Sequence, residues 1–374
     1  MDQIKPCPVI WALGNKGYFL QTPMISILTA QLPVLAVTNA NNINLQNYIE
    51  QNHLLYSVDV PSNWKSTVKF FFTLPKARAQ LMKKLQQHAS AIHIVMCSPW
   101  DIFFLGIATK VGVPVIVTIH DAVQHKGEES FVMDYLRDWC ISKADLVTVL
   151  SYHVAQTLRE NRKFKKPLKV ILNGWVTITK PALSARKFPM TGATKLLFHG
   201  RIHAYKGLDL LLDAMLLLQK SGRKYFLTIA GAGDISAYQE KISRVSNIHI
   251  LNSFLAEEQI HSLLTEHDIS VMPYIEASQS GVARDVLWAA LPAIVTPVGA
   301  LPKQFTHKTD ALVTKTVSAS ALAQEIERLS TDRALYESLS AGFYNTYKKT
   351  GPDQAAKQWK DIYMNIQNFR EFKL

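Results

Sequence analysis

The sequence has few cysteines and no long apolar segment. Its three cysteines, Cys7, Cys97 and Cys140, lie far apart, without the paired spacing of a disulfide framework or a zinc site. We therefore expect a reducing compartment. The N-terminus lacks the basic start, apolar run and cleavage site of a secretory signal, and no stretch approaches the roughly 20 apolar residues that span a bilayer. We predict a cytoplasmic protein, soluble or peripheral to a membrane.

Acidic residues are also in deficit. The 374 residues include 41 Lys and Arg but only 29 Asp and Glu, a net charge of +12. This excess favours nucleic acid, an anionic membrane or phosphorylated substrates as partners. No nucleic-acid recognition motif accompanies the charge, so we do not expect nucleic acid. A content of 48% hydrophobic and 19% charged residues indicates a globular protein, and the length fits two domains.

Short apolar runs alternate with longer helical patterns along the chain. The runs are nearly continuous, which is typical of parallel strands buried on both faces. The expected strands of the first half are residues 9–13, 34–37, 92–96, 115–119, 146–150 and 170–172. The pattern stops in a predicted linker and then restarts. The linker is residues 180–194, and the later strands are residues 196–199, 226–230, 248–251, 269–272 and 293–296.

Two closing helices are expected at residues 336–347 and 354–369, the second opened by the Gly351-Pro352-Asp353 break. Together these patterns predict an α/β fold class with two Rossmann-like, doubly wound parallel-sheet domains.

The most informative stretch follows the strand expected at residues 196–199. This strand ends at Gly200, Arg201 and Lys206 follow five residues apart, and an amphipathic helix begins near Gly207. Such a turn gathers backbone N–H groups at the positive end of a helix dipole, which favours a bound phosphate. Arg201 can bind two phosphate oxygens at once, and Lys206 adds a compact charge. The alternative is a surface loop that is basic without a ligand.

This stretch resembles the Gly-Arg, then Lys-Gly, signature of the GT4-like retaining glycosyltransferases (glycosyl transferases group 1), which have a GT-B fold. The resemblance implies that Gly200, Arg201 and Lys206 bind the donor diphosphate and neutralise the leaving group. It implies no cofactor and no metal. It also implies an acceptor-binding domain at 1–185, a donor-binding domain at 190–350 facing it across a cleft, and a final helix at 351–374 that crosses back to the first domain.

A second segment resembles the acidic motif of the same family, in which two spaced glutamates bracket a glycine-rich loop. Counting back from Pro292 places Asp285 at the second acid, the ribose position, and Ala277 at the first, next to Glu276. Glu276 is either a donor-binding residue or an exposed loop acid. A serine-rich variant of the motif implies that loop amides and hydroxyls bind the donor. That loop comprises Ser278, Gln279, Ser280, Gly281 and Val282.

The strand expected at residues 115–119 ends in a His120-Asp121 pair. Reactive groups of open α/β sheets gather outside the carboxyl ends of the strands. The string resembles the Thr-x-His-Asp segment of the family, which implies that His120 contacts the donor hexose at the reaction centre and that Asp121 positions it. His125 and Glu128 are candidates for the acceptor side. No Gly-x-Ser-x-Gly elbow supports a hydrolase instead.

Two glycine turns complete the predicted donor site. Gly17 lies in a turn after the first strand, and the resemblance implies that donor and acceptor approach each other there; a plain tight turn is the alternative. Gly231 and Gly233 resemble the Gly-x-Gly loop that the family places near the nucleotide base, where glycine permits close backbone approach.

Residues after two other strands match the family as well. Ser151 and the Asn173-Gly174 pair occupy positions near an inter-domain cleft, and both are equally consistent with simple turns. His199 and His203 flank Arg201, and packing is the favoured role for both.

Cations and aromatic residues are mixed in two segments of the first half, residues 64–84 and 159–169. We expect the first segment to form two helices around Pro75. Basic helices with aromatic side chains suit an anionic membrane surface, where each cation near the head groups contributes about 1 kcal/mol. The alternative is a solvated basic face over an ordinary core stripe.

The resemblance implies transfer of a hexose from a UDP- or GDP-sugar to a hydroxyl of a glycan or lipid-linked saccharide, with retention at the anomeric carbon. Bacterial cell-envelope polysaccharide synthesis, at the inner face of the cytoplasmic membrane, is the expected setting. Two alternatives stay open. The protein is a non-catalytic nucleotide-sugar-binding homologue, since the first acid of the motif is lost, or a GT-B-shaped epimerase or phosphorylase with the same fold.

Overall fold

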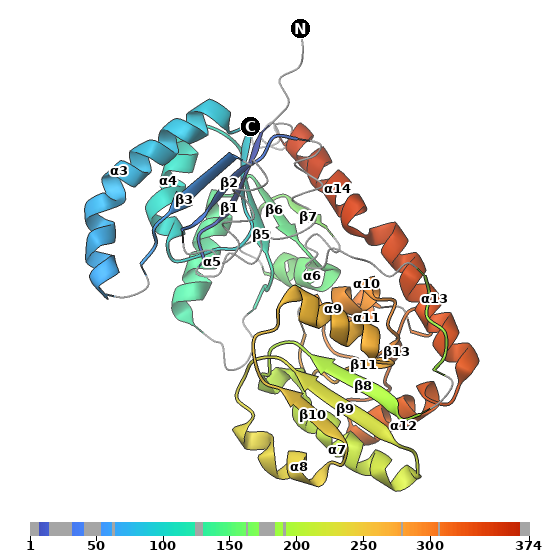
Figure 1. The fold of residues 1–374 in the computed structure, drawn as a ribbon. Coiled ribbons are helices and arrows are strands. Elements are labelled where there is room, and N and C mark those ends of the chain that lie inside the picture. Colours follow the sequence, from blue (N-terminus) through green and yellow to red (C-terminus); the bar gives the residue numbers. More distant parts are fainter. Residues whose placement is uncertain are drawn as a thin grey trace. The chain divides into compact units, whose positions relative to one another are not determined.

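The chain divides into two compact units, Met1–Trp175 with Pro352–Leu374, and Val176–Gly351 (Figure 1). Each unit contains one wholly parallel sheet with its own helices, which confirms the predicted fold class. The computed structural model describes residues 7–14, 32–40, 54–61, 64–123, 130–161, 164–171, 184–189, 192–277, 280–305 and 307–366.

The first unit has a seven-stranded sheet in the order β3-β2-β1-β4-β5-β6-β7. The chain winds outward from β1 in both directions, as in doubly wound folds. Every residue of β1, β2, β4, β5 and β6 is buried, which explains why their sequences are mainly apolar. The strands are β1 Pro8–Ala12, β2 Leu35–Asn39, β3 Leu54–Val58, β4 Ala91–Ile94, β5 Val115–Ile119, β6 Leu146–Val149 and β7 Leu168–Val170.

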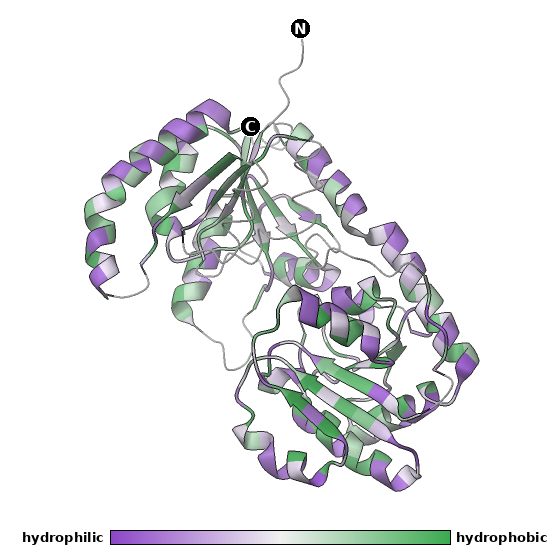
Figure 2. Ribbon diagram, viewed as in Figure 1, coloured by the Kyte–Doolittle hydropathy of each residue, from purple (hydrophilic) through white to green (hydrophobic). Residues whose placement is uncertain are grey.

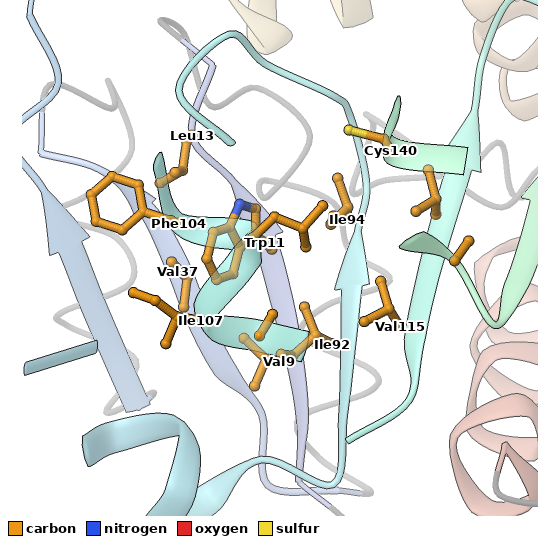
Figure 3. Close-up of a cluster of buried hydrophobic side chains, with 14 of the residues drawn as sticks. Val9, Trp11, Leu13, Val37, Ile92, Ile94, Phe104, Ile107, Val115 and Cys140 are labelled. Carbon is orange, nitrogen blue, oxygen red and sulfur yellow. The ribbon is translucent and has the colours of Figure 1, made fainter. Parts of the chain in front are cut away.

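One face of this sheet packs on the cluster around Trp11, shown in Figure 3. The other face is covered by α14, whose Ala355, Trp359 and Tyr363 are buried in one cluster with Ile10 and Ile116. The helices of the unit are α3 Trp64–His88, α4 Asp101–Val111, α5 Phe131–Lys143, α6 Tyr152–Glu160 and α14 Pro352–Asn365. Among the helices of the described chain, none is both long and apolar enough to span a bilayer.

The prediction of two helices around Pro75 is wrong, because α3 runs through this proline as a single 25-residue helix. A proline inside a helix removes one hydrogen bond and crowds the preceding turn. Burial on both sides of Pro75 compensates for that cost. Phe70 packs edge-to-face on Trp100, with ring centroids 5.4 Å apart, and Leu81 and Leu85 are fully buried on the other side.

The second unit has a six-stranded parallel sheet in the order β10-β9-β8-β11-β12-β13. In Figure 2 hydrophobic residues fill its central strands, whereas its helices carry both hydrophobic and hydrophilic residues. The strands are β8 Thr194–His199, β9 Tyr225–Ala230, β10 Ile248–Leu251, β11 Ile269–Met272, β12 Ala293–Val295 and β13 Leu312–Val313. The helices are α7 Leu208–Leu218, α8 Gln239–Arg244, α9 Glu257–Glu266, α10 Gly281–Trp288, α11 Leu301–Gln304, α12 Ala319–Leu329 and α13 Arg333–Thr350, with 3-10 turns η2 Ala204–Lys206, η3 Gln219–Ser221 and η4 Ser236–Tyr238.

Part of the predicted linker is anchored to this second unit. Residues 184–189 form no helix or strand, but the Arg186 guanidinium donates hydrogen bonds to the backbone carbonyls of Ala289, His267 and Leu264. These carbonyls lie at the ends of α10 and α9, where orphan acceptors need partners. The segment therefore closes the end of the domain instead of merely connecting two domains.

Candidate functional site

The cationic turn after β8 has the predicted strand, turn and helix arrangement. Gly200 has a positive φ of 108°, Arg201 is exposed, and η2 leads to Gly207, which has a φ of 71° and precedes α7. Positive φ angles favour glycine, since other side chains are strained there. The two glycines thus bracket the turn that carries both predicted phosphate-binding cations.

A second loop lies directly against this turn. A Cβ atom on Gly231 would lie 1.9 Å from the Gly200 carbonyl oxygen, and one on Gly233 would lie 2.3 Å from the Ile202 carbonyl oxygen. The Ile202 amide also donates to the Ala232 carbonyl at 2.9 Å. Gly231 and Gly233, which were expected to lie near the nucleotide base, therefore also allow the loops after β8 and β9 to pack backbone to backbone.

The two predicted phosphate-binding cations have different surroundings. The Arg201 side chain is exposed, whereas Lys206 is only 8% exposed. Lys206 Nζ lies 3.9 Å from the ring centroid of Tyr274 and 5.3 Å from that of Tyr205. Both distances are within the range of cation–π attraction. Lys206 is thus held in place, while Arg201 is presented to solvent.

The segment after β11 joins this turn. The Ile275 amide donates to the Tyr205 carbonyl at 2.9 Å, and a Cβ atom on Gly207 would lie 1.9 Å from the Pro273 carbonyl oxygen. Glu276, which follows, is half-buried. The carboxyl ends of β8 and β11 therefore form one edge, as expected for the ligand edge of an open α/β sheet.

Helix α10 starts at the same edge. Ser280 is its N-cap, and the Ser280 hydroxyl accepts from the Ala283 amide at 3.3 Å. Val282 lies beside Gly200, and its Cγ2 would be 3.0 Å from a Cβ atom there. Gly281 opens the helix, so amide groups and the positive dipole end meet the cationic turn. Ser278 and Gln279 lie outside the described residues.

Asp285 is buried one turn into α10. Its Oδ2 lies 3.4 Å from Nε2 of His199, the last residue of β8, whose ring is also buried. The neighbouring Arg284 has a lowered pKa because of burial, an effect that the charge of Asp285 opposes. The structure therefore brings together Lys206, the start of α10, and the predicted ribose carboxylate with a histidine behind it.

In the first unit, His120 follows β5 as predicted and is half-buried. His120 Nε2 donates to the Val95 carbonyl at 2.8 Å, so the ring is oriented by the loop after β4. Burial and the nearby His120 lower the pKa of His93 to about 3. Asp121 is also half-buried. Gly17, His125, Glu128 and the Asn173-Gly174 pair lie outside the described residues.

Ser151 has a clear local role. It is the N-cap of α6, and its hydroxyl accepts from the Val154 amide at 3.2 Å. The Ser151 side chain is buried, so an N-cap accounts for this serine without a ligand.

Tyr274 is the site residue to which the sequence analysis assigned no role. It precedes Glu276 by two residues in the sequence, but only the fold places its ring against Lys206 and its hydroxyl 3.1 Å from Ser280 Oγ. Its position two residues after a buried strand, at the ligand edge of the sheet, is the signal that sequence alone offers.

Comparisons with known proteins match both units. A family model described as Glycosyl transferases group 1 matches residues 193–332, and one described as Glycosyltransferase Family 4 matches residues 34–177. A 2-deoxystreptamine glucosyltransferase of Streptomyces kanamyceticus is 23% identical over 261 residues, which are 63% of this chain and 66% of that relative. The match thus spans slightly less than two thirds of the relative.

Three solved structures share the fold over nearly their whole length. A glycosyltransferase from Rickettsia africae is 16% identical, with a TM-score of 0.69 and coverage of 97% of this chain and 99% of that one. Sucrose-phosphate synthase from Thermosynechococcus elongatus is 15% identical, with a TM-score of 0.73 and coverage of 97% and 100%. Anabaena HepE in complex with UDP and glucose is 13% identical, with a TM-score of 0.73 and coverage of 96% and 99%.

At such low identities the structural matches show only the fold. The resemblance to a family rests on the two family models. Together they confirm the resemblance drawn from the cationic turn: each unit of the chain matches a glycosyltransferase family model, and the chain has the GT-B fold.

Proposed function

We propose that this protein transfers a hexose from a nucleoside diphosphate sugar to a hydroxyl of a glycan or lipid-linked saccharide, with retention at the anomeric carbon. The observation that carries the proposal is the shared edge in the second unit. There the Lys206-Gly207 turn packs on the segment after β11, and the start of α10 adjoins Gly200. Cations and a helix N-terminus at one place favour a diphosphate.

The proposed roles follow from the surroundings of each residue. The exposed Arg201 binds diphosphate oxygens in a bidentate manner, and the ammonium of Lys206 opposes the charge that grows on the leaving group. Asp285 accepts hydrogen bonds from the ribose hydroxyls. The amides at the start of α10, with the Ser278 and Gln279 loop, bind the sugar and its phosphate. The fold relative HepE, solved with UDP and glucose, supports a UDP-sugar as one candidate donor.

For the reaction we propose attack by the acceptor hydroxyl on the face that the diphosphate leaves. The bond from the anomeric carbon to the diphosphate oxygen breaks, the new glycosidic bond forms, and the departing phosphate takes the acceptor proton. His120 and Asp121 are the proposed catalytic residues of the first unit. Metal independence stays a prediction, which activity in the presence of a chelator would test.

Binding and turnover of Arg201→Ala and Lys206→Ala test the donor site. UDP- and GDP-sugars should raise the melting temperature of the wild type, because a ligand of the folded state stabilises it. Each variant should lose most of that shift and at least about a hundredfold in kcat. Arg244→Ala, at an exposed arginine of α8, is the matched control and should behave as the wild type.

Unchanged stabilisation and turnover in both variants would refute the donor-site proposal. The alternatives give other results. A non-catalytic homologue shows stabilisation by a nucleotide sugar without turnover in the wild type, and an epimerase returns a nucleotide sugar of altered configuration without needing an acceptor.

We also propose that the first unit binds an anionic membrane surface, at the cytoplasmic face of a bacterial inner membrane where a lipid-linked acceptor would lie. Of three consecutive phenylalanines on α3, Phe70 is buried, whereas Phe71 is 51% and Phe72 is 83% exposed. The same helix carries the exposed cations Lys65, Lys69, Lys76 and Lys83. Phe70 is therefore a core residue, as the alternative of an ordinary core stripe predicts. Phe71 and Phe72 are exposed and are available to contact a membrane surface.

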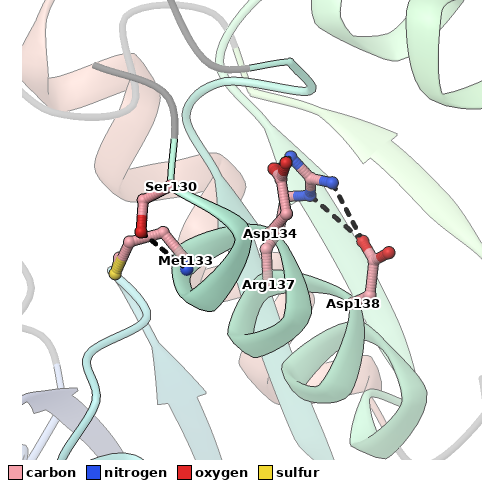
Figure 4. A network of polar contacts seen from close by, with 5 residues as sticks. All are labelled: Ser130, Met133, Asp134, Arg137 and Asp138. Carbon is pink, nitrogen blue, oxygen red and sulfur yellow. Dashed lines mark hydrogen bonds and ion pairs between the residues drawn. The ribbon is translucent and has the colours of Figure 1, made fainter.

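Helix α5 exposes apolar side chains at its start as well. Phe131 is 96% and Tyr135 is 67% exposed, next to the Ser130 N-cap (Figure 4). On the same helix, the Arg137 guanidinium forms ion pairs with Asp134 at 2.7 Å and with Asp138 at 3.1 Å. The membrane proposal therefore rests on the cations of α3, and the apolar turn of α5 is the proposed second contact.

Sedimentation with vesicles containing phosphatidylserine tests this surface. Binding should occur at low salt, weaken at moderate salt because the cations are screened, and fall further in Phe72→Ser. Vesicles of phosphatidylcholine alone serve as the control. No binding to the anionic vesicles at low salt would remove the proposal.

A further inference from the structure

We infer that Tyr274 is a positioning residue of the donor site, which holds Lys206 with its ring and the start of α10 with its hydroxyl. This inference rests on the proposed function. Tyr274 is 1% exposed and lies two residues after the end of β11. Its ring centroid is 3.9 Å from Lys206 Nζ, and its hydroxyl is 3.1 Å from Ser280 Oγ.

The backbone on both sides of the ring is fixed, so the contact with Lys206 is not a chance rotamer. The Ile275 amide donates to the Tyr205 carbonyl, and the Thr296 hydroxyl donates to the Tyr274 carbonyl. Gly207 packs against the Pro273 carbonyl with no room for a Cβ atom. The lysine turn and the tyrosine segment are therefore packed together through their backbones.

An aromatic face is well suited to hold a lysine that must bind a phosphate. Its quadrupole attracts the ammonium and restricts its position, most strongly where water is excluded, but it carries no formal charge. The Tyr274 contact therefore orients Lys206 without neutralising it. A carboxylate in the same place would bind the ammonium more strongly but would cancel the charge that the leaving diphosphate needs.

The hydroxyl of Tyr274 extends the arrangement to the helix. Ser280 Oγ accepts from the Ala283 amide, and the Ser280 amide donates to Gln304 Oε1 at 3.1 Å. Tyr274 thus connects the cation and the N-terminus of α10, the two groups expected to share one diphosphate. Burial raises the pKa of Tyr274, so the phenol stays neutral at physiological pH.

The test is a double-mutant cycle between Tyr274 and Lys206, with UDP affinity from calorimetry and with kcat and KM for the UDP-sugar. Lys206→Met alone should weaken UDP strongly. Tyr274→Leu alone should weaken UDP about tenfold, because the ammonium loses its ring contact. In the Lys206→Met background Tyr274→Leu should lose the part of its effect that acts through Lys206 and keep only the smaller part that comes from the missing hydroxyl.

Two further variants keep the test decisive if Tyr274→Leu does not fold. Tyr274→Phe retains the ring and removes only the hydroxyl, so it should raise the KM for the UDP-sugar about threefold to fivefold while Lys206 keeps its full effect. Tyr225→Phe is the matched control. Tyr225 is also buried, its hydroxyl is 3.2 Å from Ser330 Oγ, and it lies at the start of β9, away from the ligand edge.

The results separate this inference from the proposed function. If Lys206→Met leaves UDP affinity unchanged, the donor site itself is wrong. If Lys206→Met weakens UDP but Tyr274→Leu adds its full effect in that background, or Tyr274→Phe behaves as Tyr225→Phe, then Tyr274 is only a core residue and the inference is overturned.

Discussion

The two units differ in the contacts that hold together the segments around their predicted site residues. In the second unit backbone meets backbone, with Gly231 against Gly200 and Gly207 against Pro273. In the first unit side chains make the connections. His93 is hydrogen-bonded to Thr118 at 2.6 Å and to Tyr363 at 2.7 Å, and Asp101 accepts from Trp11 at 2.8 Å.

The difference shows which kind of site a sequence reveals. A close backbone contact requires glycine, because any other residue would place a Cβ atom in the contact. Such glycines can therefore be recognised in the sequence. A buried side-chain network joins residues that are distant in the chain and of ordinary types. The second unit was therefore predicted in more detail than the first, and three perturbations sharpen the contrast.

The largest effect is expected from Gly231→Ala, which attacks the backbone contact. The new Cβ would lie 1.9 Å from a carbonyl oxygen at a φ of 150°, so the loops must separate. We expect a loss of about 3 kcal/mol or more in the free energy of unfolding, together with loss of nucleotide binding. Denaturant unfolding with UDP titration measures both.

The matched control is Gly222→Ala. Gly222 also has a positive φ, 76°, but a Cβ atom added there would have nothing within 4 Å. Only backbone strain of about 1 kcal/mol is expected there. Equal losses in the two variants would show that φ, and not the close contact, decides the effect.

The side-chain network of the first unit should appear in the pH dependence of stability. Burial lowers the pKa of His93 from 6.5 to about 3. Between these values the unfolded chain binds a proton that the folded protein does not. The His93 contribution to the free energy of unfolding should therefore be full above pH 6.5 and fall towards pH 3, by up to about 1.4 kcal/mol per pH unit.

Asp101 opposes this trend. Burial raises the pKa of Asp101 from 3.8 to about 7, so its contribution is full below pH 3.8 and is lost as the pH rises through 7. Between about pH 4.5 and 6.5 the two contributions nearly cancel, so the wild-type curve should be almost flat. Asp101→Asn should make the free energy of unfolding fall on acidification, whereas His93→Gln should make it rise. Urea unfolding between pH 4.5 and 6.5 measures this. Parallel curves for all three proteins would contradict the assignment.

The smallest effect is expected at the helix caps. Ser151→Ala removes the acceptor for the Val154 amide and should cost about 1 kcal/mol of stability without changing turnover. Ser280→Ala should cost a similar amount and also raise the KM for the donor, because α10 adjoins the cationic turn. Loss of turnover in Ser151→Ala would show that the first unit uses its cap for function as well.

The core strands were predicted well because burial on both faces makes their sequences mainly apolar. The strands at residues 115–119, 248–251 and 269–272 match β5, β10 and β11 to the residue. The other predicted strands differ by one or two residues at one or both ends, and the strand predicted at 170–172 shares only Val170 with β7. Two edge strands were missed. Strand β3 is largely exposed or half-buried, and β13 has two residues, so neither produces an apolar run.

Helix α3 and Tyr274 were misjudged for a common reason. Pro75 predicts a break, and only the burial of Phe70, Leu81 and Leu85 on other elements keeps the helix continuous. Likewise nothing around Tyr274 in the sequence indicates Lys206, which precedes it by 68 positions and reaches it only through the pairing of β8 with β11.

The sequence by itself determined the two parallel-sheet domains, the family and the cationic turn, since each depends on local features: apolar runs, glycines and closely spaced charges. Tertiary structure alone decided that Lys206 is held against an aromatic ring and that His199 lies next to Asp285. Those contacts join segments far apart in the chain, and their energies exist only when the folded backbone brings the side chains within reach of one another.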